Sequence, residues 1–310
     1  MDHRLTVEER RSEPTVRCAV CWAVLALVVL AGGYLGVSLF VAARFTAPNR
    51  QPPQRTPADV GLGYREVGFE STDGVPLAAW WIPSTDEGSA RAALLVHGWD
   101  GDKSDRQVIE TALIYARAGY GVLLLDLRGS GASGGERRTL GYEETRDVRG
   151  ALAWLEGEGF KPQRILLHGW SMGAATVVRS APGTGVAAVI EEAGYADLPL
   201  ILRKQIPESS GLPRFFNPGI FLAAKLFLGL DPWAVRPAED AARLREEGVP
   251  LFIVHSTADE VVPFEHAELF ATAYPDAALW KIEGFEHVEA YTHPEYREKI
   301  LNFLESENLR

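Results

Sequence analysis

Residues 164–176 read RILLHGWSMGAAT, and this stretch decides the fold of the chain. It is typical of a short apolar strand, a tight turn, and a helix that begins with small residues. Ser171 lies at the apex between Gly169 and Gly173, in the Gly-x-Ser-x-Gly pattern of a nucleophile elbow. A serine on such a sharp turn presents its hydroxyl group above a sheet, and a side chain at either glycine position would collide with a neighbouring strand or helix. The pattern therefore predicts that Ser171 is a nucleophile.

The five-residue pattern alone is weak evidence, because a second copy occurs at residues 131–135 with Ser133 at its centre. This copy lies in a glycine-rich run, is followed by the charged residues 136–138, and has no helix of small residues behind it. A nucleophile elbow requires a strand before the serine and a helix after it. We therefore interpret residues 131–135 as a loop.

The composition is that of a globular protein without a nucleic-acid surface. The chain has 310 residues, 46% hydrophobic and 24% charged, which allows one large α/β domain with appendages or two small domains. Its formal net charge is −11 and its pI is about 5.2. Phosphate binding needs a basic patch, and the sequence has no run of lysine and arginine. We therefore expect no nucleic-acid partner.

The two cysteines, Cys18 and Cys21, both lie at the start of an apolar N-terminal run. The rest of the chain is free of cysteine, so it can hold neither a disulfide framework nor a thiolate metal site. The C-x-x-C motif is not accompanied by a second pair of cysteines. We therefore do not interpret it as a metal site or a redox site. The sequence also has no metal cluster, phosphate loop or dinucleotide fingerprint, and we expect no metal and no cofactor.

The N-terminal region has the composition of a membrane anchor. Residues 1–17 are polar and of mixed charge, and residues 18–45 are apolar with no charge before Arg44. A run of this length can span a bilayer as a helix. The alternative is a cleavable signal peptide, although its apolar core is normally about 7–15 residues long. Residues 41–43, Val-Ala-Ala, would serve as a cleavage site, so this alternative stays open.

Charges on either side of the run indicate its orientation. Four arginines precede it and three follow it, which favours a single-pass helix with a cytoplasmic N-terminus and a body outside the cytoplasm; they are Arg4, Arg10, Arg11, Arg17, and then Arg44, Arg50 and Arg55. Residues 46–61 are rich in proline. We expect them to form an extended linker that holds the body off the membrane.

Residues 62–310 alternate between strand and helix patterns. The first two strands should form an antiparallel pair, and the later ones are apolar throughout, as in a parallel sheet covered on both faces. The expected strands are 64–70, 77–82, 92–97, 121–126, 164–168, 187–190, 250–255 and 277–282; the expected helices are 104–118, 142–155, 237–246, 264–273 and 294–304. Residues 196–232, with prolines and apolar bursts, break the alternation. We interpret them as a short helical lid, with plain helical packing or a membrane-touching lid as alternatives.

Two further residues are placed to work with Ser171. Asp259 follows the strand 251–255 and His287 follows the strand 277–282, so both should lie at the sheet edge where Ser171 lies. His287 would take the serine proton, and Asp259 would hold the histidine tautomer. A turn role for Asp259, with Glu260 as its competitor, is the alternative. Of the seven histidines, only His287 combines a late loop with a preceding strand; the others are His3, His97, His168, His255, His266 and His293.

The chain resembles the α/β-hydrolase family over roughly residues 64–306, and looks closest to the esterase and serine-peptidase-like branch with a short lid. The order of the motifs carries the resemblance, because nucleophile, acid and base follow as Ser, Asp, His in this fold. The motifs are His97-Gly98, Asp126-x-Arg128-Gly129-x-Gly131, Gly169-x-Ser171-x-Gly173, Ser256-x-x-Asp259 followed by Val262-Pro263, and His287. The resemblance implies an α/β-hydrolase fold with a mostly parallel, eight-stranded sheet flanked by helices, here preceded by a transmembrane helix.

The backbone of two residues should form the oxyanion hole. One N–H belongs to Met172, after the nucleophile, and the resemblance implies that Trp99 supplies the other. Alternatively, Trp99 is only a wall of the pocket. The resemblance also implies a structural role for His97. We expect Asp126 and Arg128 to form a structural pair that holds a loop, and residues 80–81, Trp-Trp, to lie in the core.

The function that this sequence predicts is serine hydrolysis of a carboxylic ester, or of an amide, through an acyl-enzyme. A serine peptidase or thioesterase on the same fold is the nearest alternative, and a non-catalytic binding module is a more distant one. The apolar residues of the expected lid favour a small, uncharged and partly apolar substrate. Nothing in the sequence indicates an oligomeric state.

Overall fold

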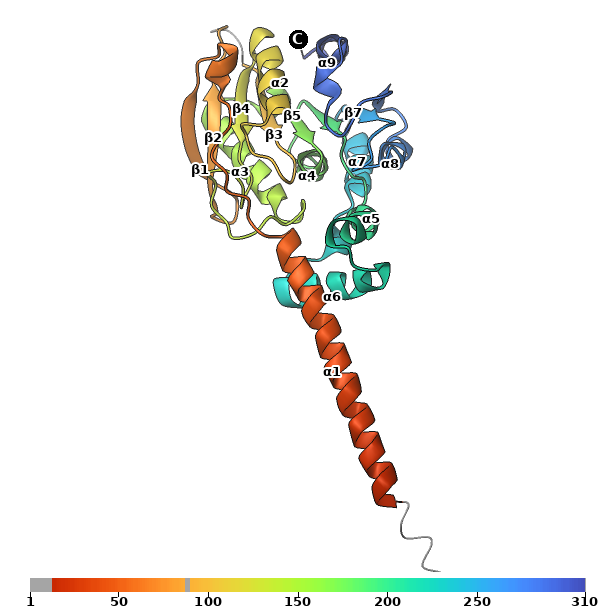
Figure 1. Ribbon diagram of the computed structural model, residues 1–310. Coiled ribbons are helices and arrows are strands. Elements are labelled where there is room, and N and C mark those ends of the chain that lie inside the picture. The colour runs from red at the N-terminus through yellow and green to blue at the C-terminus, as the bar shows by residue number, and fades with distance from the viewer. Residues whose placement is uncertain (1–12, 87–89, 310) are drawn as a thin grey trace, which may run out of the picture.

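A sheet of eight strands forms the centre of the body in the computed structural model, which describes residues 13–86 and 90–309 (Figure 1). Its order is β1-β2-β4-β3-β5-β6-β7-β8. The pairs β1–β2 and β2–β4 are antiparallel and the other five are parallel, so the predicted mostly parallel sheet is confirmed. The bounds are β1 Arg65–Glu70, β2 Pro76–Ile82, β3 Ala92–Val96, β4 Gly121–Leu125, β5 Ile165–Trp170, β6 Ala188–Glu192, β7 Leu251–Ser256 and β8 Ala278–Ile282.

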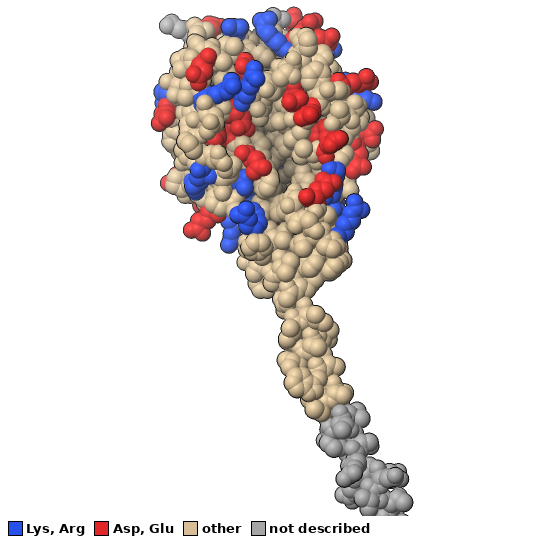
Figure 2. Space-filling model, in the orientation of Figure 1, with Lys and Arg blue, Asp and Glu red and all other residues tan. Residues whose placement is uncertain are grey.

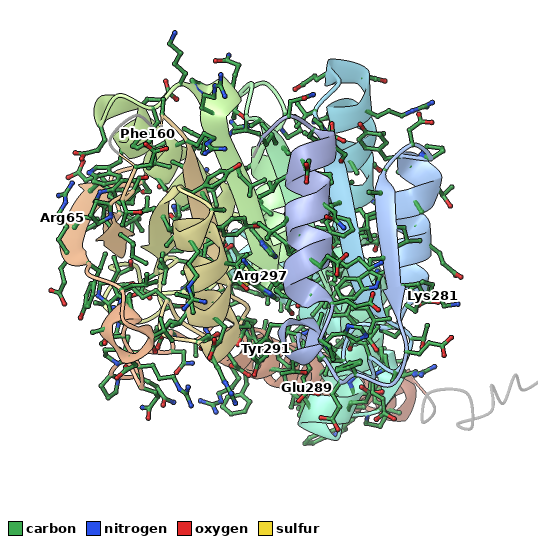
Figure 3. All side chains as sticks on the ribbon, turned by 90° about the horizontal axis from the view of Figure 1, so that it is seen from above. Arg65, Phe160, Lys281, Glu289, Tyr291 and Arg297 are labelled. Atoms are coloured by element: carbon green, nitrogen blue, oxygen red, sulfur yellow. The ribbon has the colours of Figure 1, made fainter. Side chains whose placement is uncertain are left out.

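Helices cover both faces of this sheet, which runs between the edges marked by Arg65 and Lys281 in Figure 3. One face packs on α3 Glu144–Gly157, α4 Met172–Ser180, α7 Pro237–Glu247 and α8 Glu265–Ala273; the other packs on α2 Arg106–Arg117 and α9 Tyr296–Ser306. Trp80 and Trp81, both buried, belong to the opposite faces, as their successive positions on a strand require. The prediction that both lie in the core is confirmed. Short 3-10 turns complete the body at Pro57–Val60, Pro162–Arg164 and Ala290–Thr292.

The segment between β6 and α7 is helical, as predicted for residues 196–232. It consists of α5 Leu198–Ser210, a 3-10 turn at Arg214–Phe216, α6 Asn217–Leu228 and a second 3-10 turn at Pro232–Ala234. Asp197 caps α5 by accepting a hydrogen bond from the Leu200 amide at 2.8 Å. Figure 1 shows α5 and α6 at the end of the body from which the N-terminal helix projects. This segment, α5 through α6, is called the lid segment below.

The N-terminal helix α1, Glu13–Phe45, projects from the body (Figure 1). It ends at the predicted residue and begins before the predicted span of residues 18–45; residues 1–12 of the expected polar tail lie outside the described residues. Cys18–Phe45 has a mean hydropathy of 2.4, and 11% of its apolar window is buried. The helix is therefore long and apolar enough to cross a membrane, a property that signal sequences share.

Residues 46–61, predicted as an extended linker that holds the body off the membrane, are bonded along the body. The Asn49 amide donates to the Gly129 carbonyl at 2.7 Å, and the Arg50 guanidinium donates to the carbonyls of Ser133 and Gly135. The Gln54 amide donates to Ser104 Oγ at 3.1 Å. The prolines keep the chain extended, but its polar groups bond to the body, so the end of α1 is fixed against it.

The loop after β4 is held by two buried ion pairs rather than by one. Asp126 and Arg128 were predicted to form a pair. They do not bond to each other, and each bonds to a different partner. Asp126 accepts hydrogen bonds from the Lys103 side chain, and from the amides of Lys103 at 2.9 Å and Ala132 at 2.8 Å. Arg128 donates to Asp147 on α3 through Nε at 2.9 Å and Nη2 at 2.8 Å. The structural role is as expected, and the pairing is different.

The loop also contains the second Gly-x-Ser-x-Gly copy, which is a loop as predicted. Ser133 is 1% exposed, accepts a hydrogen bond from the Ala78 amide at 2.8 Å and donates to the Asp126 carbonyl at 2.6 Å. Its hydroxyl group therefore links the loop to β2 and faces no cavity.

Replacing Arg128 by methionine should strongly destabilise the body. Asp147, with a fully buried side chain, would lose its ionic partner, and breaking a buried pair in this way costs about 3 to 5 kcal/mol. The control is Arg65→Met, which breaks a surface pair with Glu158 whose members are 53% and 37% exposed, and should cost about 1 kcal/mol or less. Denaturant unfolding of both variants measures the difference, and equal losses would contradict this account of the loop.

Candidate active site

Ser171 lies on a strained turn between β5 and α4. Its φ and ψ are 53° and −118°, a left-handed conformation that a serine adopts only where its surroundings impose it. A Cβ atom at Gly169 would lie 2.3 Å from the Gly173 carbonyl oxygen, and one at Gly173 would lie 2.2 Å from that of Val96. The Ser171 amide donates to the Glu192 carbonyl on β6 at 2.9 Å. Glycine is therefore required at both positions, and the turn is pinned to its neighbouring strand.

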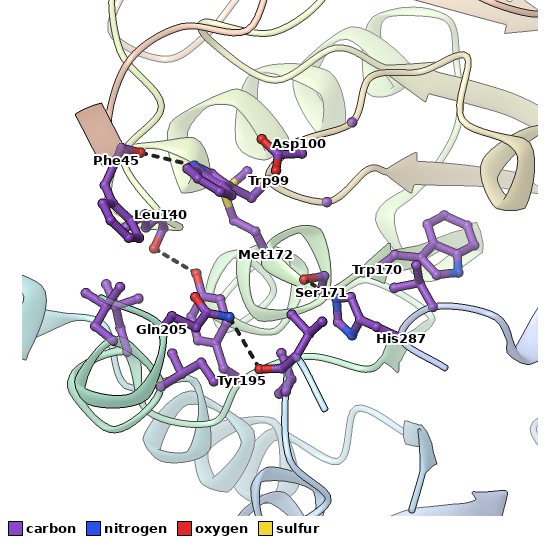
Figure 4. Close-up of a pocket in the computed structure, with 18 of the residues that line it drawn as sticks. Phe45, Trp99, Asp100, Leu140, Trp170, Ser171, Met172, Tyr195, Gln205 and His287 are labelled. Atoms are coloured by element: carbon purple, nitrogen blue, oxygen red, sulfur yellow. Dashed lines mark hydrogen bonds between the residues drawn. The ribbon is translucent and has the colours of Figure 1, made fainter. Parts of the chain in front are cut away.

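A chain of hydrogen bonds connects the three residues predicted to work together. His287 Nε2 lies 2.9 Å from Ser171 Oγ (Figure 4). His287 Nδ1 lies 2.7 Å from Asp259 Oδ2. Asp259 follows β7, and His287 lies in the loop between β8 and the 3-10 turn Ala290–Thr292. The structure thus brings the three predicted residues together at the carboxyl edge of the sheet.

The Asp259 carboxylate is fixed on both of its oxygens. Oδ1 accepts hydrogen bonds from the amides of Val261 at 2.9 Å and Val262 at 2.8 Å, which leaves Oδ2 for His287. The side chain is 1% exposed, whereas Glu260 is exposed to solvent. A histidine oriented in this way by a carboxylate can accept a proton from the serine hydroxyl at Nε2. Of the two acidic candidates, Asp259 is therefore the one in position.

The other described histidines have structural partners. His97 Nε2 accepts from the Leu127 amide at 3.1 Å, and His168 Nδ1 bonds to the Tyr115 hydroxyl at 2.9 Å, away from Ser171. His255 Nε2 lies 2.8 Å from the Val262 carbonyl oxygen, behind Asp259. His266 Nδ1 accepts from the Ala196 amide at 3.1 Å. His293 Nδ1 accepts from the Glu295 amide at 3.1 Å. None of these five rings is bonded to Ser171, and His3 lies outside the described residues.

The loop after β3 passes directly over Ser171. A Cβ atom at Gly98 would lie 3.3 Å from Ser171 Cβ, and the Gly101 amide closes a turn onto the Gly98 carbonyl at 3.3 Å. Trp99 is in this turn and lines the same cavity as Ser171. Met172 is the first residue of α4, where an amide has no partner within its own helix. Both residues that were predicted to form the oxyanion hole therefore line the cavity that contains Ser171.

The Trp99 ring has a second role as a wall of the cavity. Its Nε1 donates to the Phe45 carbonyl at 3.2 Å, and the two rings stack with centroids 5.7 Å apart. The Arg138 guanidinium lies 4.6 Å from the centroid of the indole on its π face. The two interpretations of Trp99, backbone donor and pocket wall, are compatible.

A cavity of about 390 Å³ lies in front of Ser171 (Figure 4). This volume is within the usual range for small-molecule sites, about 300–1,000 Å³. Polar side chains of the loop after β3 and the start of α2 form one end, and the lid segment and the end of α1 form an apolar end. The first set is Asp100, Asp105 and Gln107; the second is Phe45, Leu140, Leu198, Ile201 and Leu202. Burial raises the pKa of Asp105.

Backbone strain is concentrated around this cavity. Five described residues other than glycine have a positive φ, and Leu140, Ser171 and Val288 among them line the cavity. Such conformations cost about 1 to 3 kcal/mol each and persist where the surrounding structure imposes them, often at functional sites. The strained residues therefore lie around the same cavity as the hydrogen-bonded chain of Ser171, His287 and Asp259.

The sequence did not indicate Phe45, Tyr195 or Gln205 as lining residues. Phe45 belongs to the apolar run interpreted as a membrane span. Tyr195 precedes the lid segment and Gln205 belongs to it, and no periodicity of the sequence reveals how this segment packs. Tyr195 fixes the wall by donating to the Leu140 carbonyl at 2.9 Å. Among the described residues no group of three or more His, Cys, Asp or Glu side chains could hold a metal ion.

The chain matches known proteins over most of its body. The family model described as "Alpha/beta hydrolase family" matches residues 93–294. An uncharacterized protein of Escherichia coli K12, YfhR, is 28% identical over 250 residues, which are 77% of this chain and 79% of that protein. Another, YqkD of Bacillus subtilis, is 26% identical over 202 residues, 63% of this chain and 65% of that protein.

Solved structures of esterases share the fold. The Pyrococcus furiosus esterase Pf2001 superposes with a TM-score of 0.68 at 23% identity, covering 84% of this chain and 98% of that one. Est1E of Butyrivibrio proteoclasticus, solved with ferulic acid bound, superposes with a TM-score of 0.63 at 20% identity, covering 78% and 99%. At such identities these likenesses show the fold alone.

His266 should make the fold sensitive to acid. Burial lowers its pKa to about 4, so between pH 6.5 and 4 the unfolded chain binds a proton that the folded chain does not, and stability falls as the pH falls. In His266→Asn the amide oxygen can still accept from the Ala196 amide but does not titrate. The loss of unfolding free energy between pH 7 and pH 5 should shrink by about 1 to 2 kcal/mol in denaturant titrations. A His266 variant as acid-sensitive as the wild type would refute the assignment.

Proposed function

The chain belongs to the alpha/beta hydrolase family, and from this premise we propose that it is a membrane-anchored serine hydrolase that cleaves a carboxylic ester, or an amide, through an acyl-enzyme. The observation that carries the proposal is the hydrogen-bonded chain from Ser171 through His287 to Asp259. The chain begins at the strained turn of Ser171 and lines a cavity whose volume suits a small molecule. The esterases among the solved structures with this fold favour an ester over an amide.

Acylation would proceed in one addition and one elimination. Ser171 Oγ adds to the carbonyl carbon of the substrate while His287 Nε2 takes its proton, and Asp259 stabilises the imidazolium. The carbonyl oxygen becomes an anion, which the amides of Met172 and Trp99 would stabilise by hydrogen bonds. The tetrahedral intermediate then expels the alcohol, which takes the proton from His287, and the acyl group stays on Ser171.

Deacylation would repeat these steps with water. His287 Nε2 takes a proton from the water as its oxygen adds to the acyl carbon, and the same proton then returns to Ser171 Oγ as the carboxylic acid leaves. The proton transfers between Ser171 Oγ and His287 Nε2 join two atoms that lie 2.9 Å apart in this structure. No further residue is needed to balance the reaction.

The anchoring part of the proposal rests on α1. Its apolar stretch Cys18–Phe45 exceeds the about 20 residues that a bilayer requires, and its N-terminal half is exposed in the structure. The arginine asymmetry of the sequence then places the N-terminus in the cytoplasm and the body outside it. The lid segment would cover the cavity, because Leu198, Ile201 and Leu202 of α5 line it.

Substitution of the three residues should abolish ester hydrolysis by the full chain in detergent. We expect Ser171→Ala and His287→Ala to lower kcat by about 10⁴-fold or more, and Asp259→Asn by about 10³- to 10⁴-fold, measured on p-nitrophenyl esters from acetate to palmitate. Glu260→Gln, next to Asp259 and exposed, is the matched control and should retain full activity.

Activity that survives in Ser171→Ala would show that the nucleophile is wrong. A fluorophosphonate probe separates the enzyme from a non-catalytic binding module, because it labels only an activated serine. Labelling of the wild type but not of Ser171→Ala supports catalysis. A folded wild type that neither reacts with the probe nor cleaves any ester or amide would point to the binding module.

The proposed topology can be tested by protease protection. In right-side-out sealed vesicles, a tag after the C-terminus should be digested from outside, and a tag before Met1 should be protected until detergent is added. The two tags should also remain on one chain of full mass, because an anchor stays uncleaved. A protected C-terminal tag would reverse the orientation, and separate tags would show a cleaved signal peptide.

A further inference from the structure

The end of α1 is part of the wall of the cavity, which joins the membrane helix to the candidate active site. Phe45, its last residue, lines the cavity and accepts the hydrogen bond of the Trp99 indole. One turn earlier, Val41 and Ala42 are buried against the body. A helix that served only as a tether would not need such contacts.

The lid segment packs against α1 at a close approach. A Cβ atom at Gly219 would lie 2.4 Å from the Tyr34 ring and 2.6 Å from Ser38 Oγ, so only glycine fits. The Tyr34 hydroxyl donates to the Phe215 carbonyl at 2.8 Å and accepts from the Gly219 amide at 3.0 Å. Its ring stacks on Phe216, with centroids 5.0 Å apart. The beginning of α6 is thus fixed at the level of Tyr34.

The length of α1 places this level in the membrane. A hydrocarbon core of about 30 Å takes about 20 helical residues, which from Cys18 reaches about Val37. Tyr34 falls within that stretch. Its hydroxyl and ring are therefore at the depth where aromatic side chains gather at membrane interfaces. Because α6 is bonded to Tyr34, α6 must lie at the same depth.

The outer face of α6 has the side chains that this depth requires. Figure 1 shows α6 lying across α1. The exposed side chains of α6 are apolar except Lys225, which pairs with Asp231 at 2.6 Å. On the face shown in Figure 2, the uncharged surface of α1 continues onto this part of the body, and charged side chains begin above it. Helices with exposed apolar faces lie in the plane of membrane interfaces. The exposed residues are Phe215 at 62%, Leu222 at 43%, Leu226 at 64% and Phe227 at 57%.

An apolar cleft runs from this region toward Ser171. It lies between α1, α5 and α6, and four of its lining residues also line the main cavity, namely Phe45, Leu140, Leu198 and Leu202. Its own walls include Ala42, Ile206, Ile220, Phe221 and Ala224. The volume of the cleft is about 40 Å³, far below that of a ligand site of its own. The cleft is therefore an extension of the cavity toward the membrane level.

The charges of the main cavity restrict the other end of a substrate. Asp100 and Asp105 are the charged side chains that line it, and neither lysine nor arginine is among its lining residues. Arg138 pairs with Asp100 at 3.1 Å, whereas Asp105 forms no ion pair with a lysine or arginine of the described residues 13–86 and 90–309. An anionic group placed there would be repelled and would lose its hydration without a partner. The polar end thus suits an uncharged alcohol.

We propose that the substrate is an uncharged long-chain lipid ester, which enters from the bilayer between α1, α5 and α6. Only a few methylene groups of its acyl chain lie in the apolar cleft, and the rest of the chain extends from the cleft toward the bilayer. Its carbonyl carbon reaches Ser171, and its alcohol lies toward Asp105 and Gln107. This inference rests on the proposed function, because it assigns a substrate class to that same site.

The route is tested with the full chain in phosphatidylcholine vesicles that contain monooleoylglycerol. Release of oleate is compared with hydrolysis of p-nitrophenyl acetate from water. Ala42→Phe fills the cleft and should lower the ratio of the two rates by about tenfold or more, since a small displacement of the reacting carbonyl already has an effect of that size. Ala43→Phe, on the same helical turn but exposed, should keep the wild-type ratio. Equal ratios in all three proteins would overturn the route.

Should Ala42→Phe fail to fold, the outer face of α6 supplies a second test. The double variant Leu226→Glu, Phe227→Glu should lower the same ratio by about tenfold, because charged side chains are expelled from the membrane level. Leu269→Glu is the matched control, at a leucine of α8 that is 38% exposed. An unchanged ratio in the double variant would show that α6 does not contact the membrane.

The charge of the substrate is tested by a matched pair of lipids. Monooleoylglycerol should be cleaved at least about tenfold faster than its phosphate ester, oleoyl lysophosphatidic acid, which has the same acyl chain and an anionic head. Faster cleavage of the anionic lipid would refute the assignment of the polar end. Hydrolysis of p-nitrophenyl acetate that depends on Ser171 distinguishes the two proposals. If it is absent, the proposed function is wrong. If it is present but the lipid ester is not cleaved, only this inference is wrong.

Discussion

The turn at Ser171 is the constraint on which the rest of the structure depends. Its left-handed backbone is held because Gly173 touches the carbonyl of Val96 on β3 and the Ser171 amide bonds to Glu192 on β6. Three neighbouring parallel strands, β3, β5 and β6, therefore have to be in register before the hydroxyl group points into the cavity. The fully buried strands and the helices on both faces provide that register.

A second dependence connects the site to α1. Phe45, the last residue of α1, stacks on Trp99 and lines the cavity. The N-terminal helix therefore contacts the body directly at the candidate site. The loop that carries Trp99 is the same loop that passes over Ser171. The position of α1 therefore bears on the geometry around the nucleophile, and residues 46–61, bonded along the body, keep that position fixed.

The sequence predicted the sheet, its eight strands and the proximity of Ser171, Asp259 and His287, because these depend on local patterns. The patterns are apolar runs, a glycine-flanked serine, and polar residues in the loops after strands. The partners of Asp126 and Arg128 were not predictable, because Lys103 and Asp147 approach them only through tertiary packing. Proline content indicated an extended backbone for residues 46–61, but not what that backbone bonds to. The position of Phe45 in the cavity was not predictable for a similar reason. An apolar residue at the end of a helix gives the same sequence pattern whether it contacts lipid or forms the wall of a cavity.

The most direct test of the account is the mass of the Ser171 peptide after brief incubation of the full chain, in phosphatidylcholine vesicles, with monooleoylglycerol and quenching in acid. The account predicts an oleoyl adduct on Ser171, absent from Ser171→Ala, because the acyl group passes through this hydroxyl oxygen. Hydrolysis that proceeds with the acyl adduct on another residue, or equally well in Ser171→Ala, would contradict it.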